Sequence, residues 1–165
     1  FTNALKNNQF DIFIEMDADF SHNPNELRKN IERFSTNNLD LLIASRYLKN
    51  SKIINWGLKR RILSKLSNIL ARVLLGVKLR DFTNGYRIYS KRAVEVITKK
   101  CGNIGDGFII LSEIIIVLKN NYFKINETET TFVNRTRGES SVNIKLILAS
   151  LYGILKLYFI KDKLN

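Results

Sequence analysis

The sequence has few of the residues that build disulfides, histidine-rich metal sites and catalytic triads. Its 165 residues include one cysteine, Cys101, and one histidine, His22. A single cysteine excludes an internal disulfide, supports no metal–thiolate site and favours a reducing compartment. A single histidine excludes a site made of several histidines and argues against a Ser-His-Asp triad.

Acidic residues are also scarce. The chain has 15 Asp and Glu against 27 Lys and Arg, a formal net charge of +12. Such an excess indicates an anionic partner, which could be a nucleic acid, a phosphorylated ligand or an acidic membrane surface. A nucleic-acid-binding module would interleave aromatic and basic residues. Here the aromatic residues lie mostly in apolar runs, so we expect no nucleic-acid partner.

Long apolar runs are missing as well, since none reaches the ~18 residues that indicate a transmembrane helix. Residues 144–160 are mostly apolar but include Lys145 and Lys156. This pattern predicts an amphipathic helix that packs on the core or lies on a membrane surface.

The start of the sequence is that of a continuing chain. It begins with Phe1, its only methionine is Met16, and residues 5–8 resemble the tail of a helix that leads into a strand. We therefore expect a fragment, or the C-terminal portion of a longer chain.

Apolar runs and helical periodicity alternate along the sequence, which predicts an α/β fold with parallel crossovers. Strands are predicted at residues 11–16, 40–45 and 124–133 and at the end of residues 81–89, and helices from near residue 24 and at residues 58–75, 91–100, 108–118 and 144–160. Asn23 or Ser21 can cap the first of these helices, and Gly76 is expected to end the second. In the helix over residues 58–75, an apolar face is formed by Leu58, Ile62, Leu66, Ile69 and Val73. Three cations open that helix, which indicates either a bound anion or a solvated basic face.

The segment Asp17-Ala18-Asp19 follows the first predicted strand directly. In open α/β sheets, ligands bind at the carboxyl ends of the strands, so both carboxylates are expected there. Two aspartates so close together suit a hard divalent cation such as Mg²⁺ or Mn²⁺. The alternative is that they only start a turn and cap the helix that follows Pro24.

The residues around this segment resemble family 2, GT-A-type glycosyltransferases, and more narrowly their dolichol-phosphate mannosyltransferase group. The resemblance spans most of the chain and is carried, in order, by Asp17-Ala18-Asp19-Phe20-Ser21-His22-Asn23-Pro24, Ser45-Arg46-Tyr47, Trp56-x-x-Lys59-Arg60-x-Ile62-x-Ser64, Asp81-x-Thr83-x-Gly85-Tyr86-Arg87-x-Tyr89 and Phe132-x-x-Arg135-x-x-Gly138-Glu139-Ser140. It implies an α/β, GT-A-like (Rossmann-like) fold, with a mostly parallel sheet flanked by helices and with the N-terminal nucleotide-binding portion missing.

By this resemblance, Asp17, Asp19 and Ser21 hold Mg²⁺ or Mn²⁺, with Asp19 as the more direct ligand. Asp19 and Arg135 would be the catalytic residues. Arg135 would clamp the donor diphosphate, because a guanidinium binds phosphate with two parallel hydrogen bonds.

The resemblance assigns the acceptor phosphate to Arg46, Arg60 and Ser64. Arg60 and Ser64 are four residues apart and share one helix face. For Arg46 the alternative is a salt bridge at a strand end.

Glu113 matches a family glutamate, and it would contact a sugar hydroxyl or pair with an arginine. Asp81 and Arg87 could pair and shape the acceptor loop. His22 is expected at the surface or in a hydrogen bond, not as a ligand. The family lysine after Gly-x-Ser is Ser141 here, so one phosphate-binding cation is absent from its position.

The resemblance predicts two parts, a partial GT-A catalytic domain over residues 1–142 and a C-terminal amphipathic helix over residues 143–165, membrane-proximal or packed on the core. The implied activity is inverting transfer of a hexose, mannose from GDP-mannose, to a polyprenyl (dolichyl) phosphate. The alternatives are a UDP-sugar transferase acting on polyprenyl phosphate or polysaccharide, and an inactive membrane-surface relic.

The expected partners are a nucleotide sugar donor, a polyprenyl phosphate acceptor and a membrane surface. The expected location is the cytoplasmic face of a membrane, with peripheral binding or with anchoring by segments outside this chain. The 165 residues alone are predicted to be inactive, because the base and ribose site of the family precedes them.

Overall fold

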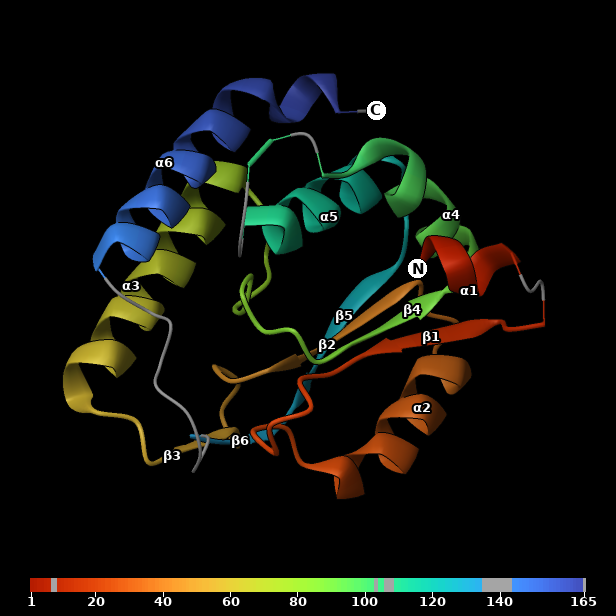
Figure 1. The fold of residues 1–165 in the computed structure, drawn as a ribbon, viewed down its shortest axis with the longest axis horizontal. Coiled ribbons are helices and arrows are strands. Elements are labelled where there is room, and N and C mark those ends of the chain that lie inside the picture. The colour runs from red at the N-terminus through yellow and green to blue at the C-terminus, as the bar shows by residue number, and fades with distance from the viewer. Residues whose placement is uncertain (7–8, 103, 106–108, 135–143, 165) are drawn as a thin grey trace.

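A computed structural model describes residues 1–6, 9–102, 104–105, 109–134 and 144–164 (Figure 1). Its elements, in chain order, are α1 (Thr2–Lys6), β1 (Ile12–Glu15), a 3₁₀ turn (Pro24–Glu26), α2 (Leu27–Thr36), β2 (Leu41–Ser45), β3 (Lys52–Ile54), α3 (Leu58–Leu75), β4 (Arg87–Ser90), α4 (Lys91–Lys100), α5 (Ile109–Asn120), β5 (Ile125–Glu129), β6 (Thr131–Val133), α6 (Ile144–Ile160) and a second 3₁₀ turn (Lys161–Lys163).

The main sheet has the strand order β1-β4-β2-β5. Strands β2 and β5 pair in parallel, whereas β4 runs antiparallel to both β1 and β2. Three of the four strands therefore share one direction, and the predicted α/β fold with parallel sheet elements is confirmed. The crossover through α2 joins strands of the same direction, but β4 lies between them, which the local sequence pattern did not reveal.

This topology brings several loops to one edge of the sheet. The carboxyl ends of β1, β2 and β5 meet there, together with the amino end of the reversed strand β4. Beyond this edge, β3 and β6 form a small parallel sheet of their own. The loops that hold Asp17, Asp19, Arg46 and Asp81 all leave from this edge.

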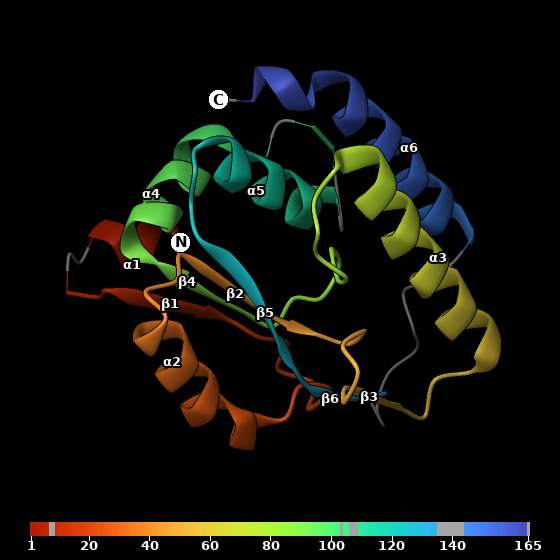
Figure 2. The ribbon, with the colours of Figure 1, turned by 180° about the vertical axis from the view of Figure 1, so that it is seen from behind.

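Helices cover both faces of the sheet (Figure 1). Helix α2 packs on one face, against β2 and β4, while α4 and α5 cover the other face. Helices α3 and α6 lie side by side at one end, as both ribbon views show (Figure 2). The main core forms between the sheet and the α4–α5 layer, and it includes Leu41, Ile43, Tyr89, Ile115 and Leu118.

Two predicted helix ends are confirmed by their capping geometry. The Asn23 side chain accepts a hydrogen bond from the Asn25 amide, and Pro24 occupies the first turn. At the other end of the long helix α3, Gly76 adopts φ 64°, a left-handed conformation that glycine adopts without steric cost.

Helix α3 turns its apolar stripe away from the core. Its buried positions are Asn68, Ala71 and Leu75. The exposed large apolar side chains of this helix are Leu58, Ile62, Leu63, Leu66, Ile69, Leu70 and Val73. Exposure of a contiguous apolar stripe is unusual for a soluble monomer and indicates a surface that binds something.

None of the helices in the described part of the chain is both long and apolar enough to cross a membrane.

Asp40, just before β2, holds several elements together. Its buried carboxylate accepts hydrogen bonds from the Ser90 hydroxyl, the Lys124 amide and the Arg92 guanidinium. Burial alone would raise the pKa of this carboxyl, but the bonds from Arg92, Lys124 and Ser90 hold it below its ordinary value. The stabilisation is therefore present above the unfolded pKa of about 3.9 and is lost as pH falls through the lower folded value.

We predict that Asp40→Asn lowers the free energy of unfolding at pH 7 by about 1–3 kcal/mol, because a charged acceptor of several hydrogen bonds is lost. The difference from wild type should shrink as pH falls from about 5 towards 2, since wild-type Asp40 then protonates. Urea denaturation across this pH range measures both. The control Glu32→Gln, in an exposed pair with Arg28, should change little. A pH-independent deficit for Asp40→Asn would contradict the prediction.

Candidate active site

Asp17 and Asp19 lie just beyond the carboxyl end of β1, as the sequence predicted. The Asp19 Oδ1 atom accepts a hydrogen bond from the Ser21 amide at 3.0 Å. The Asp17 Oδ2 atom lies 3.2 Å from Nε2 of His22. Asp17 keeps 61% of its side chain exposed, whereas the His22 side chain is fully buried. The prediction of a hydrogen-bonding His22 is confirmed, and the surface alternative is wrong.

The turn between the aspartates and Ser21 is conformationally strained. Phe20 has φ 60°, and its side chain is 87% exposed. A bulky residue in the left-handed region costs free energy, and such outliers concentrate at functional sites. The strain lets the chain reverse sharply, so that the Asp19 carboxylate meets the Ser21 amide.

The donor atoms at this turn fit a hard divalent cation. Two carboxylates and a hydroxyl oxygen are present, and the buried Ser21 Oγ has no hydrogen-bond partner in the described part of the chain. Gly85 is a neighbour of the first aspartate, since a Cβ there would be in ordinary van der Waals contact with Asp17 Oδ1, at 3.7 Å. Among the described residues no cluster of three or more His, Cys, Asp or Glu could hold a metal. Mg²⁺ suits such a sparse set, because it takes its remaining ligands from water and substrate phosphates.

Arg46 and Asp81 form a buried ion pair beside the aspartates. Arg46 Nε and Nη2 each lie 2.8 Å from an Asp81 oxygen, and the Arg46 amide donates to the same carboxylate at 2.9 Å. Nη2 also donates to the Thr83 hydroxyl at 2.7 Å. Burial alone would raise the pKa of Asp81, but Arg46 holds it below its ordinary value. The salt-bridge alternative for Arg46 is thus what the structure contains.

The negative charge of Asp17 acts on this pair. Burial alone would lower the pKa of Arg46, but Asp81 raises it, with smaller contributions from Tyr47 and Asp17. Asp17 and Arg46 therefore lie near each other, as expected for residues that follow β1 and β2 at the same edge of the sheet.

Aromatic side chains connect Arg46 with Arg60 and Ser64 on α3. The Arg60 guanidinium lies 4.0 Å from the Trp56 ring centroid, and that of Arg46 lies 5.4 Å from the same centroid. The Tyr47 hydroxyl donates to Ser64 Oγ at 2.6 Å. The three residues assigned to the acceptor phosphate are therefore brought together around Trp56 and Tyr47, two aromatic residues for which the motifs predicted no role.

The expected pairing of Asp81 with Arg87 is wrong. Asp81 is occupied by Arg46, and Arg87 donates to backbone carbonyls of Asn84, Phe82 and Leu111. A buried guanidinium has several N–H donors, and carbonyl oxygens of a tight loop can satisfy them without a counter-charge. Arg87 thereby fixes the loop over residues 81–86 onto α5.

Glu113 contacts the backbone that follows α4. It is fully buried on α5, and its Oε2 accepts a hydrogen bond from the Gly102 amide at 3.0 Å. No ion pair joins it to an arginine within the described residues. Its observed contact is with the chain that follows α4.

Arg135 and Ser141 fall outside the described residues, although Asn134, directly before Arg135, accepts a hydrogen bond from Arg60 at 3.0 Å.

Glu127 on β5 binds the backbone at Asp81 and so helps to hold the ion pair in place. The sequence predicted no role for Glu127. Its carboxylate accepts hydrogen bonds from the Arg80 and Asp81 amides, and burial raises its pKa. An acidic residue at a buried strand position was the only available signal.

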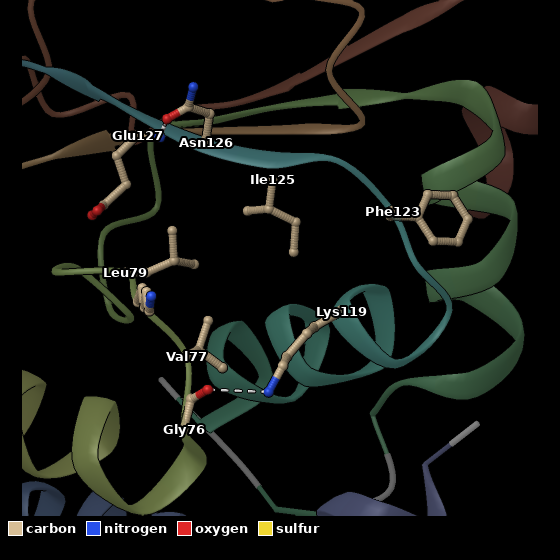
Figure 3. Close-up of a pocket in the computed structure, with 9 residues that line it drawn as sticks. Gly76, Val77, Leu79, Lys119, Phe123, Ile125, Asn126 and Glu127 are labelled. Carbon is tan, nitrogen blue, oxygen red and sulfur yellow. Dashed lines mark hydrogen bonds between the residues drawn. The ribbon is translucent and has the colours of Figure 1, made fainter.

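Glu127 also lines a cavity of about 430 Å³ at the amino end of β5 (Figure 3), together with Gly76, Val77, Lys78, Leu79, Lys119, Phe123, Ile125 and Asn126.

Comparison with known proteins relates this geometry to one family. The family model described as glycosyl transferase family 2 matches residues 1–98. The chain is 32% identical over 145 residues to a polyprenol monophosphomannose synthase of Mycolicibacterium smegmatis. It is 37% identical over 150 residues to a dolichol-phosphate mannosyltransferase of Pyrococcus furiosus.

These alignments include most of this chain but only part of each relative. They cover 88% of the chain and 54% of the first relative, and 89% of the chain and 40% of the second. The crystal structure of M. tuberculosis glucosyl-3-phosphoglycerate synthase superposes with a TM-score of 0.55, covering 92% of this chain and 49% of that one. At 14% identity this likeness shows a common fold.

The ion pair generates a stability prediction. Asp81→Ala leaves the Arg46 charge buried without a partner, so we expect the free energy of unfolding to fall by about 3–5 kcal/mol. Thr83→Val removes only the hydroxyl that accepts from Nη2 and should lower it by about 1 kcal/mol. Chemical denaturation of the two variants and wild type measures the difference. Equal losses in the two variants would contradict the prediction that the unpaired Arg46 charge carries an additional cost.

Proposed function

The chain belongs to glycosyl transferase family 2, and on that premise we propose that the full-length protein transfers mannose from GDP-mannose to a polyprenyl phosphate. The observation that carries this proposal is the position of the paired aspartates beside a cluster of arginines and aromatic rings at one sheet edge. Two anionic substrates must meet in such a reaction, and the edge offers a place for each. The names of the two mannosyl-transferring relatives favour mannose as the sugar.

Asp17, Asp19 and Ser21 would hold Mg²⁺ or Mn²⁺, with Asp19 as the direct ligand. When bound, the cation neutralises the diphosphate that leaves as the glycosyl bond breaks. We assign the second contact to that diphosphate to Arg135, which follows β6 and the Arg60 partner Asn134.

The acceptor needs a cationic pocket and no general base. A phosphate monoester oxygen is already an anion at neutral pH, so it attacks the anomeric carbon as the bond to the diphosphate breaks, and the sugar configuration inverts. What the protein supplies is alignment of the phosphate with that carbon. We propose that Arg60 and Ser64 contact the phosphate from α3, and that Arg46, fixed by Asp81, forms the floor of the pocket beside Trp56.

Asp81 and Arg87 serve this site by holding its loops, whereas Glu113 holds the chain that follows α4. Asp81 orients Arg46, and Arg87 anchors the loop that precedes β4. We assign residues 1–142 to the partial catalytic domain and residues 143–165 to the C-terminal helix, within a protein whose relatives are about twice as long.

A membrane surface is the proposed second partner, at the cytoplasmic face. The exposed apolar stripe of α3 lies beside α6, which exposes Tyr152, Leu155 and Phe159. Exposed cations of α3, including Lys59, Lys65 and Arg72, accompany the stripe. Apolar side chains combined with lysine and arginine favour an anionic lipid interface, where a polyprenyl phosphate also resides.

The transfer proposal is tested with the full-length protein, radiolabelled GDP-mannose or UDP-glucose, a short-chain polyprenyl phosphate, and Mg²⁺ or EDTA. We predict metal-dependent formation of mannosyl lipid in preference to glucosyl lipid. Asp19→Asn should lower the rate about 100-fold or more, because stabilisation of the leaving group by a cation is worth several kcal/mol.

The matched control for this assay is Asp162→Asn, which changes an exposed aspartate of the second 3₁₀ turn. It should leave the rate unchanged. Preference for UDP-glucose would reassign the donor, and absence of transfer from either donor would overturn the proposal.

For the membrane surface, we predict that Leu66→Ser weakens binding to vesicles of anionic lipid about tenfold, because one buried leucine side chain is worth about 1.5–3 kcal/mol. Vesicle sedimentation measures it, with phosphatidylcholine vesicles as the uncharged comparison. Tyr122→Ser, at a residue that is 97% exposed on the loop after α5, should bind as wild type. Equal loss in both variants would argue against a specific role for α3.

A further inference from the structure

His22 combines complete burial with a contact to an exposed carboxylate. Its Nε2 lies 3.2 Å from Asp17 Oδ2, with the histidine side chain 0% exposed and the aspartate side chain 61% exposed. An ionised carboxylate only accepts hydrogen bonds, so Nε2 must carry the proton and donate. Burying a polar ring for a single hydrogen bond is costly, so a packing role alone is a poor reason to place histidine here.

The His22 ring is held in place by its neighbours. The ring centroids of Tyr86 and Phe132 lie 5.4 Å and 5.3 Å from it, and the Phe132 ring is nearly perpendicular, at 79°. The backbone is also fixed, because His22 forms an isolated antiparallel bridge with Phe132 and the Val133 amide donates to the Ser21 carbonyl at 3.0 Å. The Nε2–H donor therefore points in one fixed direction.

This fixed donor engages one oxygen of Asp17 and leaves the other toward Gly85. A Cβ at residue 85 would lie 3.7 Å from Asp17 Oδ1. A side chain that is mostly exposed would otherwise sample several rotamers, and ordering it at the moment of metal binding costs free energy. His22 removes that cost in advance.

We propose that His22 is a positioning residue that orients Asp17 for the divalent cation, an inference that rests on the proposed function. It acts through Nε2 on the aspartate and touches neither substrate. Hydrogen-bond partners of metal-binding side chains commonly change metal affinity 10- to 100-fold when removed. The same ring packs on Phe132 in β6, so it also ties the metal turn to the strand that precedes Arg135.

Two substitutions separate the hydrogen bond from the packing. His22→Phe keeps an aromatic ring between Tyr86 and Phe132 but has no donor. His22→Gln loses the ring but keeps an N–H group that can reach Asp17. If orientation is the role, the glutamine variant should bind metal more tightly than the phenylalanine variant, whereas a packing role predicts the reverse order.

The experiment measures Mn²⁺ affinity of the full-length protein by electron paramagnetic resonance, without substrates. We expect His22→Phe to weaken binding about 10- to 100-fold and His22→Gln to restore most of it. In an Asp17→Ala background His22→Phe should have no further effect, because the side chain through which His22 acts on the metal is gone. Wild-type affinity in His22→Phe, or an equal loss in both backgrounds, would overturn the inference.

Folding and function are controlled separately. Thermal unfolding without metal shows whether each variant is folded, and if His22→Phe is not, His22→Leu takes its place under the same criteria. If wild type binds no Mn²⁺, the metal site of the proposed function fails, and this inference fails with it. If wild type binds Mn²⁺ and the donor-less variant binds equally, only the role of His22 is refuted.

Discussion

The buried ion pair between Arg46 and Asp81 lies where the parts of the site meet. Arg46 follows β2, Asp81 begins the loop before β4, and Glu127 of β5 holds the amides of residues 80 and 81. A buried ion pair contributes little net stability compared with apolar packing, but removal of either partner is costly. The pair therefore acts as a geometric constraint, since it allows one arrangement of the loops that leave this sheet edge.

Those parts of the fold that depend on local sequence patterns could be predicted from the sequence. The strand before Asp17, the capping by Asn23 and the stop at Gly76 depend on neighbouring residues, and all are confirmed. The insertion of β4 between β1 and β2 depends on pairing between distant segments, which no local pattern contains. The resemblance to a known family supplied the site residues, and the fold brings Arg46, Arg60 and Ser64 together around Trp56 and Tyr47.

Partner choice among charged residues was the least predictable part. Asp81 and Arg87 are close in sequence, but Arg87 bonds to backbone carbonyls and Asp81 to Arg46. Periodicity placed apolar residues on one face of α3 without revealing that this face is exposed. A pattern of apolar positions shows that a face is buried against something, and only the fold shows whether that is the protein's own core.

The strand order has a consequence for how the chain folds. In the register of the sheet, Glu15 of β1 pairs with Arg87 of β4, and β2 pairs with β4 and β5, so among the described residues the hydrogen-bonded neighbour of β1 is a strand that lies far along the chain. Contacts between residues so distant in sequence slow folding, because a long loop must close before they form. During synthesis β1 and the pair of aspartates that follows it therefore emerge well before β4, and this part of the site is assembled only when that reversed strand arrives.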